Sequence, residues 1–244
     1  MKLNSDLNQN KKTAKRRAGI TLPEVLIAFV VIGITSKLLI PTIYWTVAKI
    51  KLCSRYTKSY SEMAQCIKTA ERDEGNFTTW VWEDDEQVFR KYFKPYLRMR
   101  RLCGKGADVD CGSNASYKYL NGSEAGNPFS DTNYRFITDD GARWAFKVNS
   151  DCAGKAQYCA MFRVDLNGDE KPNVFGRDVF TFYMLPFTNE IVPEGLFKVT
   201  ESGYNSTTGW PKATYQEVNT NCDKNGTGTY CGARIIQDGY TMDY

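Results

Sequence analysis

The chain has 244 residues, enough for one globular head with a buried core behind a short N-terminal segment. Its hydrophobic content of 42% and charged content of 25% are ordinary for a folded protein and argue against global disorder. The net charge of +4 arises from the first nineteen residues, which hold six basic residues and one acidic residue. The remainder has a slight acidic excess, so its charge gives no reason to expect nucleic-acid binding.

An apolar run of membrane-helix length follows the basic segment, over residues 20–45. Glu24 and Lys37 are the only charged residues in it. Glu24 lies near one end, where a charge costs less than at the centre, and Lys37 can reach towards the nearer interface. Because basic residues precede the run, that end is expected to stay in the cytoplasm and the remainder to be exported.

The run Gly19–Glu24, read GITLPE, resembles the cleavage segment of type IV prepilins and type II secretion pseudopilins. The resemblance implies that a prepilin peptidase cuts between Gly19 and Ile20 and methylates the new amine. It also implies that Glu24 aligns each subunit during assembly. Ile20 departs from the family, in which phenylalanine is commonest here, and Pro23 is unusual but falls in the first helical turn, where proline is tolerated.

The same resemblance implies three parts: a cleaved cytoplasmic leader over 1–19, a transmembrane and polymerisation helix over 20–45, and an extracytoplasmic pilin-like head over 46–244. An ordinary secretory signal cut before Lys49 is the alternative. The apolar run is long for a cleaved signal, and this alternative explains neither Gly19 nor Glu24.

A helix is predicted over 22–74, because apolar residues recur at helical spacing beyond the membrane-length run and Gly75 is a natural stop. This stripe consists of Tyr56, Tyr60, Met63, Ala64, Ile67 and Ala70. A second helix is predicted over 84–98, with acidic residues at its start and a kink or early end at Pro95.

Strands are predicted over 134–138, 142–148, 160–165 and 179–185, with a tight turn at 139–141. Residues 103–133 and 201–229 are rich in small polar residues and are predicted to be loops. The fold class is therefore α+β. This layout is also that of a pilin: a long N-terminal membrane helix packed on a small antiparallel sheet with disulfide-bearing loops.

Eight cysteines follow the apolar run, and the chain has no histidine and no Cys-x-x-Cys pair. This pattern favours disulfides in an oxidising compartment over zinc, with eight reduced thiols in a cytosolic protein as the alternative. Local spacing suggests the pairs Cys103–Cys111, Cys152–Cys159 and Cys222–Cys231. Cys53 and Cys66 remain, and on one helix they would be ~20 Å apart, too far to bridge. Either at least one local pair is therefore wrong, or both remaining thiols are free or bonded elsewhere, and the sequence does not choose among the 105 connectivities that eight cysteines allow.

The loop after residue 164 is the most site-like segment. Asp165, Asn167 and Asp169 alternate oxygen side chains, and Asp178 follows before the next predicted strand. Such hard oxygen ligands suit calcium, although the spacing is not that of an EF-hand. The loop also looks similar to the calcium-holding loop of major pseudopilins. The alternative is a turn in which Asp, Asn and Gly serve backbone geometry alone.

No catalytic constellation is found, and without histidine the usual Ser-His and Cys-His pairs are excluded. We therefore predict no enzyme activity. The resemblance to prepilins implies a structural subunit of a type IV pilus or type II secretion pseudopilus. Its expected partners are the prepilin peptidase, the inner-membrane assembly machinery, the membrane and other pilin subunits. The expected location is the bacterial inner membrane and then a periplasmic or extracellular filament. The alternatives are a minor tip pilin whose head binds DNA, a glycan or a surface, and a membrane-anchored exported enzyme.

Overall fold

In the computed structural model the described residues are 21–152, 157–198 and 212–244. They belong to two compact units, one ending at Thr46 and the other covering Val47–Tyr244. Helix α1 (Leu22–Glu74) contributes to both units, and its predicted bounds are confirmed. Gly75 ends α1 with a φ of 81°, a left-handed conformation that glycine adopts without the steric cost of a Cβ atom.

The first unit consists of the N-terminal part of α1. Most of its large apolar side chains between Leu22 and Trp45 are 53–76% exposed, and they point to all sides of the helix. Within the described ranges no helix is both long enough and apolar enough to cross a membrane, in contrast to the span predicted over 20–45. The predicted cleavage residues Gly19 and Ile20 lie outside the described residues.

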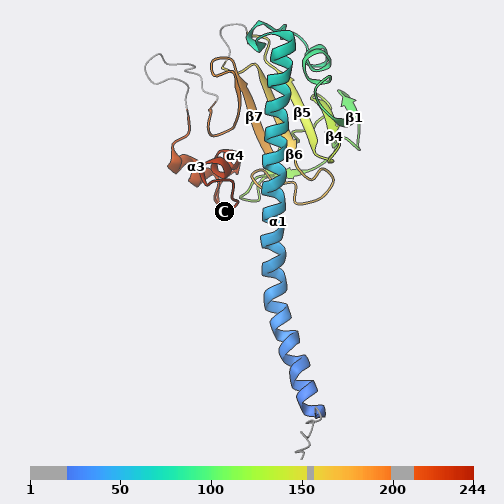
Figure 1. Cartoon of the computed structure of the whole chain (residues 1–244), viewed down its shortest axis with the longest axis vertical. Coiled ribbons are helices and arrows are strands. Elements are labelled where there is room, and N and C mark those ends of the chain that lie inside the picture. Colours follow the sequence, from blue (N-terminus) through green and yellow to red (C-terminus); the bar gives the residue numbers. More distant parts are fainter. Residues whose placement is uncertain (1–20, 153–156, 199–211) are drawn as a thin grey trace, which may run out of the picture. The chain divides into compact units, whose positions relative to one another are not determined.

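The second unit is built on a six-stranded antiparallel sheet in the order β1-β4-β5-β6-β7-β8 (Figure 1). The strands are β1 (Met99–Gly104), β4 (Tyr134–Thr138), β5 (Arg143–Val148), β6 (Ala160–Asp165), β7 (Val179–Leu185) and β8 (Glu190–Pro193). All four predicted strands are confirmed, with β5 beginning one residue later than expected. The α+β class with a long N-terminal helix on an antiparallel sheet is confirmed as well.

Several short strands were not predicted from the sequence. The edge strands β1 and β8 have partly exposed faces, so their apolar alternation is weak. A separate pair, β2 (Tyr117–Lys118) and β3 (Glu124–Ala125), lies within the segment that the sequence predicts as a loop. These elements depend on pairing with a neighbour, which sequence periodicity does not report.

The outer half of α1 packs on one face of this sheet through the predicted stripe. Tyr56, Met63, Ile67 and Ala70 are buried, while Tyr60 and Ala64 are partly buried against the same core. The Tyr56 ring lies 4.7 Å from that of Phe180, measured between centroids. The core interpretation of the stripe is therefore confirmed.

The second predicted helix ends earlier than residue 98. Helix α2 (Asp85–Val88) continues into one π-helical turn, η2 (Phe89–Phe93), and Asp84 caps its start by accepting from the backbone N–H groups of Glu86 and Gln87. Pro95 has no N–H group to continue the hydrogen-bond pattern, which gives the early end expected at this residue. A short 3-10 helix, η1 (Phe77–Thr79), connects α1 to this region.

Two short helices close the chain, α3 (Tyr215–Asn221) and α4 (Cys231–Gln237). The loop prediction over 201–229 is wrong for residues 215–221, where Thr214 and Glu217 form a reciprocal capping box that starts α3. The disulfide Cys222–Cys231 joins the end of α3 to the start of α4.

The three local disulfides predicted from spacing are confirmed. Cys53 and Cys66 are unbridged and buried. The Cys53 thiol donates to the carbonyl of Tyr240 at 2.9 Å, and the Cys66 thiol lies 3.8 Å from the carbonyl of Phe93. Burial raises the pKa of the Cys66 thiol to about 12, so it is not a reactive thiolate at neutral pH.

These assignments predict the cysteine chemistry of the protein. Non-reducing alkylation of the unfolded protein should modify two thiols, and reduction should expose six more. Peptide mass mapping should place the two thiols at Cys53 and Cys66. Eight alkylated thiols before reduction, in protein taken from its native compartment, would contradict this assignment.

Candidate functional site

The loop between β6 and β7 brings two acidic side chains together at its base. Asp165 ends β6 and pairs in register with Val179, the first residue of β7. The N–H group of Leu166 donates to the carbonyl of Asp178 at 2.8 Å, which closes the loop. Both acidic residues are fully buried. Because side chains alternate along a strand, Asp165 lies on the sheet face opposite α1.

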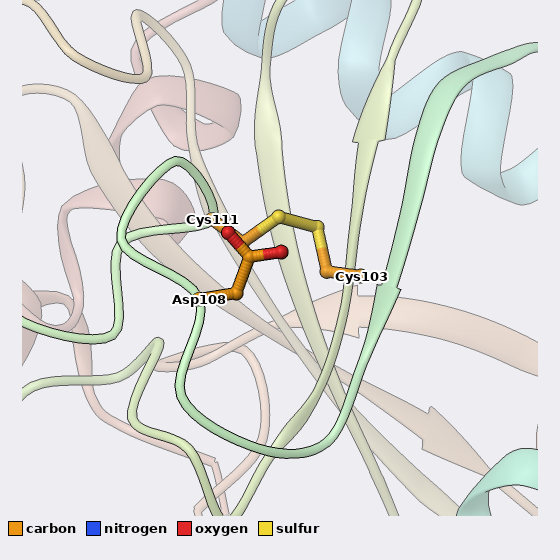
Figure 2. A group of neighbouring side chains, drawn as sticks. All are labelled: Cys103, Asp108 and Cys111. Carbon is orange, nitrogen blue, oxygen red and sulfur yellow. A yellow bond between two sulfur atoms is a disulfide. The ribbon is translucent and has the colours of Figure 1, made fainter.

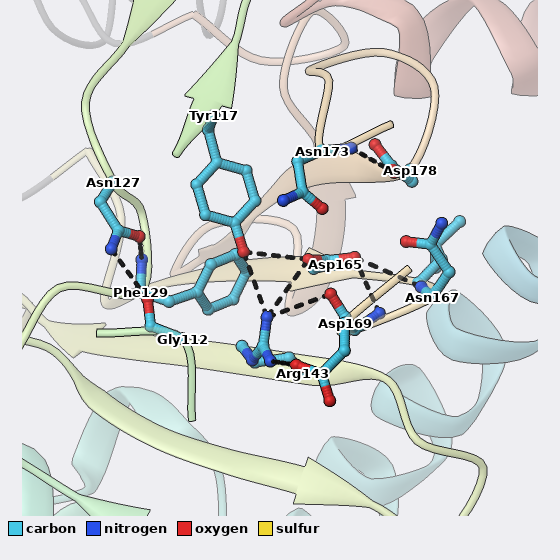
Figure 3. Close-up of polar contacts among 12 residues, drawn as sticks. Gly112, Tyr117, Asn127, Phe129, Arg143, Asp165, Asn167, Asp169, Asn173 and Asp178 are labelled. Atoms are coloured by element: carbon cyan, nitrogen blue, oxygen red, sulfur yellow. Dashed lines mark hydrogen bonds and ion pairs between the residues drawn. The ribbon is translucent and has the colours of Figure 1, made fainter. Parts of the chain in front are cut away.

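The carboxylate of Asp165 is held by four donors (Figure 3). Its Oδ1 accepts from the backbone N–H groups of Asn167 at 3.3 Å and Gly168 at 3.0 Å. Its Oδ2 accepts from the Tyr117 hydroxyl at 3.0 Å and lies 3.6 Å from Nη1 of Arg143. Gly168 has a φ of 66°, and a Cβ atom there would come within 2.8 Å of the Gly141 carbonyl oxygen, so the turn requires glycine.

The carboxylate of Asp178 fixes the other end of the loop. Its Oδ2 accepts from the N–H group of Asn173 at 2.8 Å, and its Oδ1 accepts from that of Val174 at 2.7 Å. The side-chain amide of Asn167 also donates to it. Asp165 and Asp178 therefore both organise backbone, which is the turn role that the sequence left open.

Burial is the largest cause of the raised pKa values of Asp165 and Asp178. It raises the pKa of Asp165 to about 7, with the nearby Asp178 carboxylate as the second cause. Burial likewise raises the pKa of Asp178 to about 6, against the lowering effect of its backbone hydrogen bonds. Two acidic groups that lose their hydration together need positive charge nearby to stay ionised at neutral pH.

Arg143 supplies part of that charge, and no local sequence pattern points to it. Its guanidinium is buried and donates to the Tyr117 hydroxyl at 3.3 Å and to the Gly168 carbonyl at 3.1 Å. It also pairs with Asp169, whose side chain is 84% exposed. The Asp169 carboxylate thus pairs with Arg143 and does not join the buried carboxylates of Asp165 and Asp178. Asp165 contacts both Arg143 and the loop backbone.

Two amide oxygens in the loop have no partner. The Oδ1 atoms of Asn167 and Asn173 are buried and accept no hydrogen bond within the described part of the chain. An unsatisfied buried acceptor costs about 1–3 kcal/mol, so two in one loop point to a missing positive partner. Oxygen donors of Asp165, Asp178, Asn167 and Asn173 are the hard ligands that calcium takes. Asn167 and Asn173 bring such oxygens to the loop that holds Asp165 and Asp178, whereas the predicted ligand Asp169 pairs with Arg143.

A second group of potential ligands does not fit a metal. Cys103, Cys111 and Asp108 place their donor atoms within 4.8 Å of one another, and they form the one such group of three among the described residues (Figure 2). Cys103 and Cys111 are joined in a disulfide, so neither offers the thiolate that binds metal. Asp108 instead pairs with Arg101 at 2.9 Å.

The candidate cation site predicts a calcium-dependent stability. Calcium at 100 times its dissociation constant would stabilise the folded protein by about 2.7 kcal/mol. At roughly 2–4 °C per kcal/mol for this size, the melting temperature should rise by several degrees. Differential scanning calorimetry of the full chain with calcium, magnesium and a chelator measures this shift.

Two isosteric variants identify the ligands. Asp165→Asn removes a buried charge and should abolish the calcium shift, whereas Asp169→Asn changes an exposed partner of Arg143 and should keep most of it. An unchanged melting temperature in millimolar calcium, or an equal shift in Asp165→Asn, leaves only the turn role for this loop.

The raised pKa values also predict a pH dependence without calcium. Folded Asp165 holds its proton up to about pH 7, whereas the unfolded chain releases it near 3.8. The contribution of this group to the free energy of unfolding is thus full below pH 4 and is lost as the pH rises to about 7. Relative to wild type, Asp165→Asn should become progressively more stable from pH 4.5 to 7.5 in chelator. Urea unfolding at each pH tests this, and a difference independent of pH would contradict it.

Comparison with known proteins gives a family but no activity. No curated protein and no solved structure matches the chain. A family of unknown function, DUF6613, matches residues 46–243, which begins one residue before the second compact unit. The match includes the β6–β7 loop, Arg143 and both C-terminal helices. Over this head, the chain belongs to the DUF6613 family.

Proposed function

We propose that this protein is a structural subunit of a type IV pilus or type II secretion pseudopilus, assembled through its N-terminal helix after leader cleavage. One observation carries the proposal: the first part of α1 is apolar on all sides and exposed, and it begins with a single acidic residue, Glu24. In this proposal the prepilin peptidase removes residues 1–19, and the assembly machinery of the inner membrane adds the subunit to a filament.

A helix that is apolar on every side is stable only when other apolar groups surround it. Soluble monomers rarely expose apolar patches larger than a few hundred Å². A bundle of equivalent helices in a filament provides such an environment. The proposal therefore accounts for the exposed apolar helix without requiring it to pack on its own head.

Glu24 has two roles to distinguish. Its Oε2 accepts from the N–H group and from the hydroxyl of Thr21, both at 2.8 Å, so it stabilises the start of its own helix. Its Oε1 accepts no hydrogen bond from any described residue. In the proposal, this carboxylate pairs with the positive amine that cleavage creates at Ile20 of a neighbouring subunit. Low dielectric in a filament core would strengthen that pairing.

The disulfides support the location that the proposal requires. Three bridges form in the head, and stable disulfides are typical of oxidising compartments such as the periplasm or cell exterior. The loop between β6 and β7 would add calcium as a further stabilising partner outside the cytoplasm. A minor subunit at the filament tip is the second candidate, and a polar cavity on the head favours it.

Substitution of Glu24 by glutamine tests the assembly role. Glutamine keeps an oxygen that accepts from Thr21 but loses the negative charge. The Glu24→Gln protein should be cleaved to a mature N-terminus at Ile20 and fold its head normally, yet yield less than about a tenth of the wild-type filaments, because the inter-subunit charge pair is lost. Mass spectrometry of the N-terminus and quantification of sheared filaments measure the two steps.

Thr21→Val is the matched control, since it removes the hydroxyl contact to Glu24 while keeping the charge. It should assemble nearly as wild type. Normal filament yield from cleaved Glu24→Gln protein would remove the assembly role of Glu24. A mature N-terminus at Lys49 would refute the prepilin interpretation itself.

A further inference from the structure

An open cavity of about 860 Å³ lies between α3 and the segment that leads to α4. Each described residue that lines it bears a hydroxyl, amide or carboxylate, apart from Gly226. The lining includes Gln216, Asn219, Thr220, Asn225 and Tyr230. Figure 1 shows α3 and α4 side by side near the C-terminus, at one edge of the head.

The walls of the cavity are rigid. The disulfide Cys222–Cys231 closes the segment, and Asn221 bonds across it to the Thr227 hydroxyl and the Tyr230 N–H group, both at 2.8 Å. Gly226 lies so close to Asn221 that an added Cβ atom would come within 2.0 Å of the Asn221 carbonyl oxygen. A site with walls fixed in advance loses little conformational entropy when a ligand binds.

Several polar groups of the lining remain available. The side chains of Gln216, Thr220 and Asn225 are exposed and make no hydrogen bond within the described part of the chain. The Oδ1 atom of Asn219 is buried and lacks a partner among the described residues. Amides and hydroxyls both donate and accept, so together they match a ligand that is rich in hydroxyl groups.

The charges of the cavity exclude anionic ligands. No described lining residue is basic, and Glu217 and Asp223 are acidic. An ion pair with Lys198 lowers the pKa of Glu217 to about 2, so it is ionised at neutral pH. Both acidic side chains already stabilise the backbone: Glu217 belongs to the capping box of α3, and Asp223 accepts a hydrogen bond from the Asn225 N–H group. Phosphates, sulfated sugars and nucleic acids would therefore be repelled.

We propose that this cavity binds a neutral oligosaccharide, through the free amides and hydroxyls of α3 and the following loop, with the Tyr230 ring as an apolar surface for a sugar face. The absence of aliphatic side chains among the described lining residues disfavours lipids. The proposal goes beyond assembly and does not depend on it, because all its residues lie in the head.

The test measures binding of defined oligosaccharides to the full-length protein, kept in a detergent without a sugar headgroup. Microarrays carrying neutral oligosaccharides and heparin fragments identify the best neutral ligand, and calorimetry then gives its dissociation constant. The double variant Gln216→Ala/Thr220→Ala removes two free groups on the exposed side of α3 and should weaken binding at least about tenfold. Lys224→Ala is the matched control, since Lys224 is exposed in the same segment but does not line the cavity.

Tenfold weaker binding by the double variant, with wild-type affinity in the control and unchanged melting temperatures, is the expected result. Binding to no neutral oligosaccharide, stronger binding to heparin fragments, or equal affinity in the double variant would overturn the proposal. Glu24→Gln protein should bind as wild type, so failure of assembly and failure of glycan binding are separable outcomes.

Discussion

The head is organised by the contact between the outer half of α1 and the aromatic face of its sheet. Tyr56 packs against Phe180 and Phe182, and the Trp144 and Phe162 rings extend the same layer across the neighbouring strands. Each aromatic side chain buries roughly 150–250 Å² and dominates the energetics of such a core. Any change that displaced α1 from this face would expose the largest apolar surface in the head.

The same helix fixes the C-terminal region. The hydroxyl of Tyr56 donates to the carbonyl of Gly232 in α4 at 2.9 Å, which satisfies a buried polar group at the centre of the core. Gly232 permits the approach, because an added Cβ atom would lie 3.1 Å from both the Tyr56 hydroxyl and Pro193. The position of α4, and through the disulfide that of α3, therefore depends on α1. The cavity beside α3 is therefore held in place by the packing of α4 against the core.

The opposite face of the sheet follows a different physical rule. There the charged side chains of Arg143, Asp165 and Asp178 are buried. The free-energy cost of burying an unpaired charge is much larger than the gain from burying an apolar side chain. The loop compensates with backbone N–H groups, the Tyr117 hydroxyl and Arg143, but two asparagine oxygens are left without partners. One side of the head thus obtains stability from packing, whereas the other depends on the hydrogen bonds and the ion pair that hold its buried carboxylates.

The sequence by itself determined the elements whose signals are local. The bounds of α1, strands β4, β6 and β7, and the three disulfides follow from periodicity, turn residues and short cysteine spacing. The sequence placed Asp165 and Asp178 in one candidate calcium loop with Asn167 and Asp169, because oxygen side chains recur between two predicted strands. The tertiary structure decided what depends on distant contacts. Strands β1 and β8 exist through edge pairing, α3 follows from a capping box inside a polar segment, and Arg143 reaches the loop from a neighbouring strand. Asp169 is held away from the other predicted ligands because it pairs with Arg143, and no local pattern encodes a long-range charge pair of this kind.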